Sequence, residues 1–536
     1  MDDQLFVIAI GGTGMRCLES FVHLCAIGMF DNKEINILTL DTDQGNGNKN
    51  RTETLINLYQ KIKSKDSDNI DGGHSSSKTF FSAKINLYKF FTDYNEDNRK
   101  TYLGLAGFSA GTSTTDKQNE DLSDLFLDKE TVQKFKLDMG YRAQTQLGSL
   151  LMYHSIIESA RRSKNGNDEK SPDKEFKDFI DKLTGTNGNA RVFVFGSVFG
   201  GTGASSIPII PKALAEAADI IFDHKKGIDF SKFKFGATLL TQYFKFSPVT
   251  NSIKNDNEPV VADSSIFALN SQAAMQFYCE DPTIKQCYKR LYHVGWPEMP
   301  NDKITAGNND LQIGGQNQKN DCHVVELVCA CAAYDFFTRE ITEKEAHFYF
   351  RNVTQGNGEN FDFEAKDFIG NNSEMFEKNM AAFLAFSHYV LTICAGTNEK
   401  DGGMVKIAKK DLVERNRKDY EDIPNKQLEE INDYLKRFAY DKSKNGWIYQ
   451  IKDSVLPGNF LFKPQAFEAK ENMDFINVFN EKKRFSLSLT KSPLINFLNI
   501  LSGDQPNSIK DTNSPKEELL ARIYNSIVKD QSSIKH

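Results

Sequence analysis

LFVIAIGGTGMRC, residues 5–17, is the stretch of sequence that decides the fold of this chain. Its first six residues form a continuous apolar run with several β-branched side chains, which is typical of a strand buried on both faces in a parallel sheet. The glycine-rich turn GGTG follows at once, and apolar residues then recur at helical spacing as far as Met29. A second apolar run, INILTL, occupies residues 35–40. The N-terminal segment therefore predicts strand, glycine turn, helix and strand, which is a βαβ unit.

The combination of a buried strand and a glycine turn returns in RVFVFGSVFGGTGAS, residues 191–205. Such a turn lets backbone N–H groups approach an anion, and the helix N-terminus that follows adds a partial positive charge. The turn is not a Walker A loop, because Thr202 stands where that motif requires Lys. A phosphate site here would therefore depend on backbone amides, hydroxyls and Mg²⁺. A helix is expected to continue to about Asp219, followed by a strand at 235–242 and a helix at 264–279.

Residues 320–339 predict a helix of a different kind, because its apolar residues point in nearly every direction. A helix that is apolar all round belongs in the middle of a protein. We therefore expect this central core helix to join two domains. The first, residues 1–319, is an α/β domain with a parallel sheet and carries insertions at about 44–137 and 161–189, and the second, residues 340–536, is a divergent α/β domain.

The composition is that of an ordinary globular protein, with 39% hydrophobic and 26% charged residues among 536. The 66 Lys and Arg against 73 Asp and Glu give a formal charge of −7, which argues against binding nucleic acid or an anionic membrane through bulk charge. No apolar run is long enough to span a membrane, and the N-terminus is acidic where a signal peptide would be basic. We therefore expect a cytoplasmic protein.

The other polar stretches and the cysteines indicate no further chemistry. Residues 44–78, rich in Asn, Gly, Ser and Lys, are interpreted as a loop, and the charged residues 399–448 as a solvated face. The cysteines form no CxxC pair, and the spacing of Cys and His matches no metal site. We expect the eight cysteines to be buried and reduced. They stand at positions 17, 25, 279, 287, 322, 329, 331 and 394.

The order of these segments resembles that of the tubulin/FtsZ superfamily, and more closely that of its divergent bacterial branch. GGTGAS at 200–205 resembles the tubulin signature loop, which wraps the phosphates of GTP, and IGGTG at 10–14 is similar to the first phosphate loop. DTD at 41–43 is similar to the turn after the second strand. GYR at 140–142, with the helix that follows it, resembles the γ-phosphate-sensing loop. The helix at 320–339 takes the place of the central helix. The resemblance covers about 340 residues in order and is specific mainly at the signature loop.

The resemblance implies that the chain binds GTP or GDP, with Mg²⁺, at the carboxyl ends of the strands of its first domain. The glycine loops would hold the phosphates, and the two aspartates would lie near the ribose or a magnesium-bound water. Arg142 would face the γ-phosphate, and an Asn at the start of the central helix would contact guanine. The alternative for that Asn is a place in a polar loop. The implied nucleotide-binding residues are Gly11, Gly12, Thr13, Gly14, Asp41, Asp43, Gly140, Arg142, Gly200, Gly201, Thr202, Gly203, Ala204, Ser205, Asn317 and Asn320.

Hydrolysis in the resembling family depends on assembly, because an acidic loop of the next subunit in a head-to-tail filament completes the site. The nearest match in this chain is NFDF at 360–363, so Asn360 and Asp362 are the catalytic candidates. The same NxDF pattern recurs at 472–475, and the alternative interpretation of 360–363 is a polar turn.

Three functions remain open at this point. The first is a GTPase that assembles into filaments. The second is a nucleotide-binding tubulin-fold scaffold with little hydrolysis, which acts through a protein partner on its C-terminal half. The third is a Rossmann-type NAD(P)-binding enzyme with Asp41 on a ribose hydroxyl, although Cys17 stands at the third glycine position of that fingerprint. The third function leaves GGTGAS without a role, and ligand preference for GTP or NAD(P)H separates it from the other two.

Overall fold

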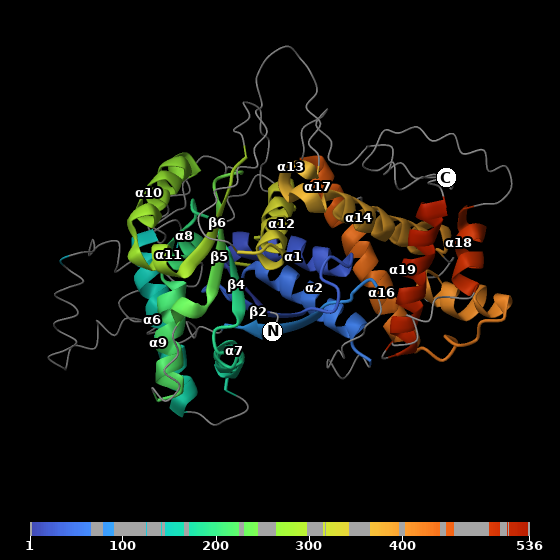
Figure 1. Cartoon of the computed structure of the whole chain (residues 1–536), viewed down its shortest axis with the longest axis horizontal. Coiled ribbons are helices and arrows are strands. Elements are labelled where there is room, and N and C mark those ends of the chain that lie inside the picture. Colours follow the sequence, from blue (N-terminus) through green and yellow to red (C-terminus); the bar gives the residue numbers. More distant parts are fainter. Residues whose placement is uncertain are drawn as a thin grey trace, which may run out of the picture.

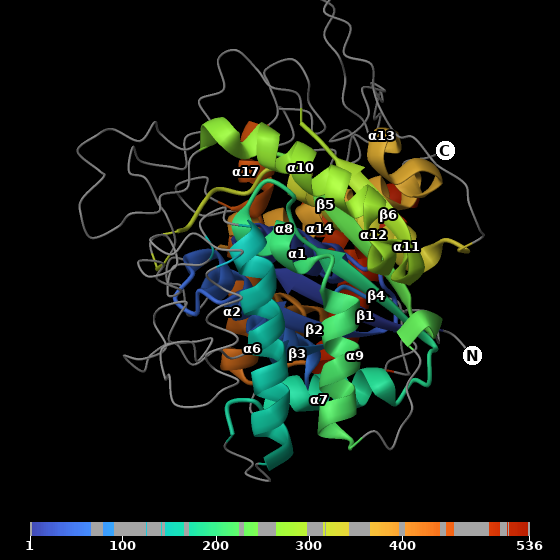
Figure 2. The same ribbon diagram turned by 90° about the vertical axis from the view of Figure 1, so that its left-hand side faces the viewer.

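Six strands form a single parallel sheet among the residues that the structure describes, in the order β3-β2-β1-β4-β5-β6 (Figure 1, Figure 2). The computed structural model describes residues 3–65, 79–90, 125, 141, 145–165, 171–223, 230–244, 264–296, 315–316, 318–341, 365–395, 402–439, 446–454, 493–503, 512 and 514–533. The strands are β1 (Gln4–Ile10), β2 (Glu34–Leu40), β3 (Lys84–Lys89), β4 (Ala190–Phe195), β5 (Lys234–Leu240) and β6 (Tyr288–Val294). The α/β class with a parallel sheet, predicted for the first domain, is confirmed.

The central strand β1 is buried on both faces, as its continuous apolar run predicts. Val7 pairs with Ile37 of β2 and with Phe193 of β4, so β1 has a hydrogen-bonded neighbour on each side. Val7 contributes to the core on one face of the sheet, and its neighbour Ile8 contributes to the core on the other face. The strands expected at 35–40, 191–195 and 235–242 are the observed β2, β4 and β5, within one or two residues at each end.

Helices cover both faces of the sheet. One face packs against α6 (Thr145–Asn165), α7 (Lys174–Thr184), α9 (Ile210–Ile221), α10 (Phe267–Glu280) and α11 (Pro282–Cys287). Figure 2 shows α6 and α9 side by side in front of the strands. The opposite face packs against α1 (Gly11–Ala26), α2 (Gly47–Lys63) and α12 (Val324–Thr338). At the centre of the sheet, the adjacent strands β1 and β4 are therefore followed by helices on opposite faces.

The described part of the C-terminal half is helical and packs outside α1, α2 and α12 (Figure 1). It consists of α13 (Lys366–Ile369), α14 (Ser373–His388), α15 (Met404–Lys406), α16 (Asn425–Ala439), α17 (Trp447–Ser454), α18 (Pro493–Ser502) and α19 (Pro515–Ser533), with short 3₁₀ and π turns. These helices share one continuous apolar core with the sheet face beneath α1. No strand occurs among the described residues after α12, so they do not form the second α/β domain expected for 340–536.

The central helix matches its prediction in character and differs at its start. Nearly every side chain of α12 is buried between the sheet and the C-terminal helices, as an all-round apolar helix requires. The helix begins at Val324 and not at residue 320, because His323 caps it. The Nδ1 atom of His323 accepts from the N–H of Val325, and the side chain of Glu326 accepts from the N–H of His323.

Three interpretations of polar segments were wrong. Residues 47–63, expected to lie in a loop, form α2, whose first turn is capped by Asn46 through the N–H groups of Asn48 and Lys49. Residues 84–89, expected within an insertion, form the edge strand β3. The charged text at 425–439 forms α16, which buries a complete apolar face against α2 and α14. The apolar residues of an amphipathic helix are interspersed with polar ones along the sequence, so the average composition of the segment does not reveal its buried face.

Candidate functional site

The two glycine loops lie next to each other at the carboxyl ends of the two central strands. The first follows β1 and leads into α1 on one face of the sheet, and the second follows β4 and leads through α8 (Gly201–Ser206) into α9 on the other face. The strand order therefore reverses between β1 and β4. In open α/β sheets a crevice forms at such a switch point, and ligands bind there. The sheet topology thus brings the two loops to the place where this architecture builds binding sites.

The contact between the loops is direct. Gly11 has a backbone φ of +66°, and a Cβ added to it would lie 3.1 Å from the Cβ of Thr202 in the second loop. Gly14 faces the end of β4, because a Cβ there would lie 2.6 Å from the carbonyl oxygen of Phe195. Gly203 is crowded in the same way by the backbone of Ser197. These three glycines allow the loops and helices to approach closely, and Gly12 and Gly200 beside them remain partly exposed.

Four residues of the two glycine loops are accessible to a ligand. Gly12, Thr13, Gly200 and Thr202 are partly exposed, whereas the glycines between them are buried. No side-chain hydrogen bond caps α1 or α8 in the described structure, and neither helix has an acidic residue in its first turn. The first N–H groups of a helix have no partner within the helix. In the 16-residue helix α1 these free N–H groups give the N-terminus a partial positive charge. The ends of the two loops are therefore suited to an anion such as a phosphate.

The Asp41–Asp43 turn lies at the end of β2, beside the first glycine loop. The N–H of Asp43 donates to one carboxylate oxygen of Asp41 at 3.1 Å, and the Asp43 carboxylate accepts from the N–H groups of Gly45 and Gly315. Burial, and then the negative charge of Asp43, raises the pKa of Asp41 to about 7. The second Asp41 oxygen, Oδ2, is buried and has no hydrogen-bond partner among the described residues. An unpartnered carboxylate oxygen beside a second carboxylate is suited to accept a hydrogen bond from a water bound to Mg²⁺.

The start of α12 supplies two further polar atoms. Asn320 is tied in place through its backbone, since its N–H donates to Asn48 and its carbonyl oxygen accepts from Arg51. Its side-chain Oδ1 is buried and has no hydrogen-bond partner in the described structure. The same is true of Nε2 of His323. Burial, and then the charge of Arg16, lowers the pKa of His323 to about 3, so the ring is neutral. Because its Nδ1 accepts a hydrogen bond, Nε2 carries the proton and is a donor.

Aromatic rings surround this end of α12. The ring of His323 lies 5.2 Å from that of Tyr243 and 5.0 Å from that of Trp296, centroid to centroid. Tyr243 in turn contacts Phe199, which precedes the second glycine loop. An unpartnered acceptor, an unpartnered donor and flat apolar rings together suit the edge and face of a heterocyclic base.

The helix after the GYR sequence, α6, lies beside the second glycine loop. A Cβ on Gly148 would lie 2.5 Å from the ring of Tyr141 and 2.7 Å from Oγ of Ser205, and Ser149 donates to the carbonyl oxygen of Ser205. The structure therefore gathers Gly11–Gly14, Gly200–Ser205, Asp41, Asp43 and Asn320 at one edge of the sheet. Five other candidates, Gly140, Arg142, Asn317, Asn360 and Asp362, lie outside the described residues.

Sequence reasoning missed the buried charges that hold this edge together. Arg16 in α1 pairs with Glu326 in α12, and Arg51 in α2 pairs with Glu19 in α1 at 2.6 Å. Arg51 also donates to the carbonyl oxygen of Asn320. The sequence did contain a signal, because Arg16 and Glu19 interrupt an otherwise apolar helix. A charge within an apolar segment indicates a partner elsewhere in the fold.

The described residues contain no group of three or more His, Cys, Asp and Glu that could hold a metal ion. None of the described helices is long and apolar enough to cross a membrane. All eight cysteines are unpaired; six are buried as expected, but Cys279 is exposed and Cys287 is half-buried. The expectation of burial was wrong for these two, because they lie on α10 and α11 at the edge of the sheet.

Comparison of the chain with protein-family models, with curated proteins and with solved structures gave no match. The interpretation of the site therefore depends on its residues and on their geometry.

Proposed function

We propose that this protein is a tubulin-like nucleotide-binding protein that holds GTP or GDP, with Mg²⁺, in the crevice between the two glycine loops. The observation that carries the proposal is the contact between Gly11 and Thr202, which joins loops about 190 residues apart at the switch point of the sheet. Packing explains Gly11, Gly14 and Gly203, but it does not explain why the exposed positions beside them are also glycine or threonine.

The roles of the residues follow from their positions. The N–H groups of Gly12, Thr13 and Gly14 at the start of α1 would bind the phosphates nearer the nucleoside. The second loop, with Gly200 and the hydroxyl of Thr202, would wrap the phosphate tail. Asp41 would hold a magnesium-bound water through its unpartnered oxygen. The base would reach the start of α12.

Asn320 and His323 would recognise that base. The Oδ1 atom of Asn320 can accept from the N–H edge of guanine, and Nε2 of His323 can donate to one of its acceptors. A buried polar atom without a partner is costly, so a ligand that satisfies both atoms gains affinity from them. This contact would favour guanine over adenine, because adenine presents a different pattern of donors and acceptors.

An NAD(P)-binding enzyme is the alternative, since the strand order of this sheet is also that of dinucleotide-binding folds. Such an enzyme would use Asp41 on a ribose hydroxyl. The buried Asp41 side chain has one oxygen that accepts from the N–H of Asp43 and one without a described partner, and the latter could serve either ligand. The second glycine loop, however, has no role in the dinucleotide alternative, and this favours the mononucleotide.

The decisive experiment identifies the nucleotide released when the purified protein is denatured. Gly200→Asp is the variant of choice, because a Cβ there meets only Oγ of Ser197, at 3.2 Å, and the new carboxylate would repel phosphate. Thr202→Val tests the hydroxyl with little change of volume. The control is Gly185→Asp, an exposed glycine at the C-terminal end of α7 where a Cβ would meet a similarly close atom, at 3.1 Å.

We expect guanine nucleotide from the wild type and the Gly185→Asp variant, and none from Gly200→Asp. NAD(P) from the wild type would reject the proposal in favour of the dinucleotide enzyme. Wild-type protein that is empty and also fails to bind added GTP would reject it too. Light scattering and phosphate release with GTP and Mg²⁺ then separate a filament-forming GTPase from a scaffold: signals that rise together with protein concentration indicate the GTPase.

A further inference from the structure

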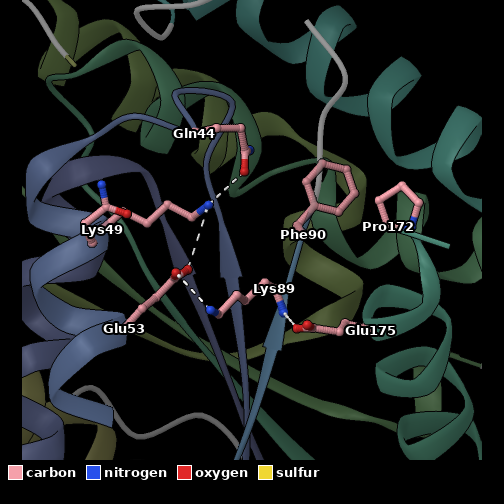
Figure 3. A pocket seen from close by; sticks show the side chains of 8 residues that line it. Gln44, Lys49, Glu53, Lys89, Phe90, Pro172 and Glu175 are labelled. Atoms are coloured by element: carbon pink, nitrogen blue, oxygen red, sulfur yellow. Dashed lines mark hydrogen bonds and ion pairs between the residues drawn. The ribbon is translucent and has the colours of Figure 1, made fainter. Parts of the chain in front are cut away.

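A cleft of about 360 Å³ lies on the same edge of the sheet as the glycine loops, on the far side of the Asp41–Asp43 turn. The first turns of α2 form one wall, the end of β3 forms the floor, and the start of α7 forms the other wall (Figure 3). We call it the α2–β3 cleft. Its lining includes Gln44, Lys49, Glu53, Lys89, Phe90 and Glu175.

Two lysines share one carboxylate inside this cleft. The ammonium group of Lys49 is 3.8 Å from the Glu53 carboxylate, and that of Lys89 is 3.5 Å from it (Figure 3). Glu53 also accepts from the hydroxyl of Thr39 at 2.7 Å, which fixes the carboxylate in place. Two cations therefore face one anion, and both are farther from it than the usual length of a direct hydrogen bond. The two ammonium groups therefore outnumber the one carboxylate that lies between them, and Glu175 at the rim supplies a second carboxylate.

Lys49 is the more unusual of the two lysines, because its side chain is only 5% exposed. Lysine is almost never buried unless it is paired. The ammonium group has three N–H donors, and the one hydrogen bond of normal length that it makes with a described residue is to the side-chain oxygen of Gln44, at 2.9 Å. A nearly buried cation with donors to spare, beside a cleft, indicates an acceptor that enters from the cleft. Lys89, 40% exposed, can reach the same acceptor from the floor.

The opposite wall is held by Glu175. Its carboxylate accepts from the backbone N–H of Lys89 at 2.7 Å and so ties the start of α7 to the end of β3 (Figure 3). This bond keeps the cleft open at a defined width. Glu175 itself is exposed at the rim, so most of its charge is screened by water.

We propose that the α2–β3 cleft is a binding site for a phosphoryl group, held by the ammonium groups of Lys49 and Lys89. Lysine binds phosphate as a point charge, without the bidentate geometry that Arg offers to both phosphates and carboxylates. The described lining of the cleft supplies lysine and no Arg. The phosphoryl group can come from a separate phosphorylated small molecule or inorganic phosphate, or from a nucleotide that binds with its tail turned away from the second glycine loop and past the Asp41–Asp43 turn. The site itself does not depend on the proposed nucleotide.

Equilibrium dialysis of the full chain with labelled inorganic phosphate tests the proposal, with Lys49→Gln and Lys89→Gln as variants. Lys89→Gln is the more secure of the two for folding, because Lys89 is partly exposed. Each substitution removes a charge-assisted hydrogen bond and should weaken phosphate binding at least about tenfold. The matched control is Lys174→Gln, which removes an exposed lysine of α7 that pairs only distantly with Asp178 and should leave binding unchanged.

The outcomes are distinct. Saturable binding to the wild type that both cleft variants weaken, and that Gly200→Asp retains, supports the cleft. Absence of saturable binding to the wild type overturns the proposal, and so does binding that both cleft variants retain. Binding that only Gly200→Asp loses places the phosphate in the glycine crevice; it overturns this proposal and leaves the proposed function standing.

Measuring the affinities for GTP and GDP, and their competition with labelled phosphate, identifies the source of the phosphoryl group. If the tail of a nucleotide fills the cleft, Lys89→Gln weakens GTP binding more than GDP binding, and GTP displaces labelled phosphate. If the ligand is separate, phosphate binds equally well in the presence of saturating GDP and GTP. Either result supports the site and identifies which of the two sources fills it.

Discussion

The guanidinium of Arg16 in α1 lies 2.5 Å from the carboxylate of Glu326 in α12, and the two side chains are 5% and 0% exposed. Glu326 also accepts from the hydroxyl of Tyr243 and from the N–H of His323, and Arg16 donates to the carbonyl oxygen of Asp321. The pair joins the helix that begins in the first glycine loop to the helix that begins at the proposed base contacts. The pair thereby fixes the start of α1 relative to the start of α12.

Removing one member of this pair should be strongly destabilising. In Arg16→Met the Glu326 carboxylate stays buried without its counter-charge, so we expect the free energy of unfolding to fall by about 3–5 kcal/mol. The double variant Arg16→Met/Glu326→Gln removes both charges and should recover most of that loss. Urea unfolding at pH 7 measures both. A single variant within about 1 kcal/mol of the wild type would contradict the structure.

Two glycines of the first loop should respond differently to alanine. A Cβ at Gly14 would lie 2.6 Å from a backbone oxygen of β4, so Gly14→Ala forces α1 away from the sheet and should lower the free energy of unfolding by about 1–3 kcal/mol. A Cβ at Gly12 would meet only side-chain atoms of Asn46, Gln318 and Asn48, the nearest at 3.2 Å. Gly12→Ala should therefore keep its stability and lose nucleotide affinity. Thermal unfolding and nucleotide titration, run on both variants, compare the two effects. Equal loss of stability in both would be evidence against the described packing.

Acid should weaken the interface between α1 and the C-terminal helices through His23. Its ring is buried against Trp447 and Tyr434, and burial, with smaller contributions from Arg51 and Arg437, lowers its pKa to about 3. The unfolded chain takes up a proton below pH 6.5 and the folded chain does not, so stability is lost as the pH falls. Between pH 6.5 and pH 5 this one group accounts for about 2 kcal/mol.

The variant His23→Phe keeps the ring and removes the titration. We expect its free energy of unfolding to fall less steeply between pH 6.5 and pH 5 than that of the wild type. The control is His293→Gln, which replaces an exposed histidine of β6 outside this interface. Identical slopes in wild type and His23→Phe would show that His23 is not buried as a neutral ring.

Thiol labelling of the native protein checks the packing of α10 and α11. Cys279 is exposed on α10 and should react within minutes with a maleimide or a disulfide reagent, and the half-buried Cys287 should react more slowly. The six buried cysteines should react only after denaturation. Mass spectrometry of native and urea-unfolded samples counts the labels, and Cys279→Ser should abolish the fast one. Rapid labelling of Cys329 or Cys331 in the native state would contradict the central position of α12.

Local patterns in the sequence were sufficient to predict the strands and helices of the N-terminal half that lie in the core. The run at residues 5–10 had to be a strand buried on both faces, and the glycine turn after it could only lead into a helix on one side. The central helix was evident for the same reason, because apolar residues around its whole circumference leave it no place except the interior. These predictions succeeded because they depend on neighbours in the sequence.

The elements that were missed are those whose character is set by neighbours in space. α2 is polar in composition and is a helix because Asn46 caps it and because Leu55, Ile56 and Tyr59 meet the C-terminal helices and β3. β3 is a half-buried strand at the edge of the described sheet, and its one described neighbour is β2. The apolar pattern of neither α2 nor β3 can be distinguished from the polar sequence around it.

The sequence by itself determined that this chain has two strand–glycine–helix units and a helix for the middle of the protein. Only the tertiary structure decided that the two glycine loops touch, that Asn320 and His323 each keep a buried polar atom without a described partner, and that Lys49 and Lys89 share a cleft. The physical reason is the range of the interactions. Hydrophobic periodicity and backbone preference act over a few residues, whereas the meeting of residues about 190 positions apart depends on the order in which the strands pair.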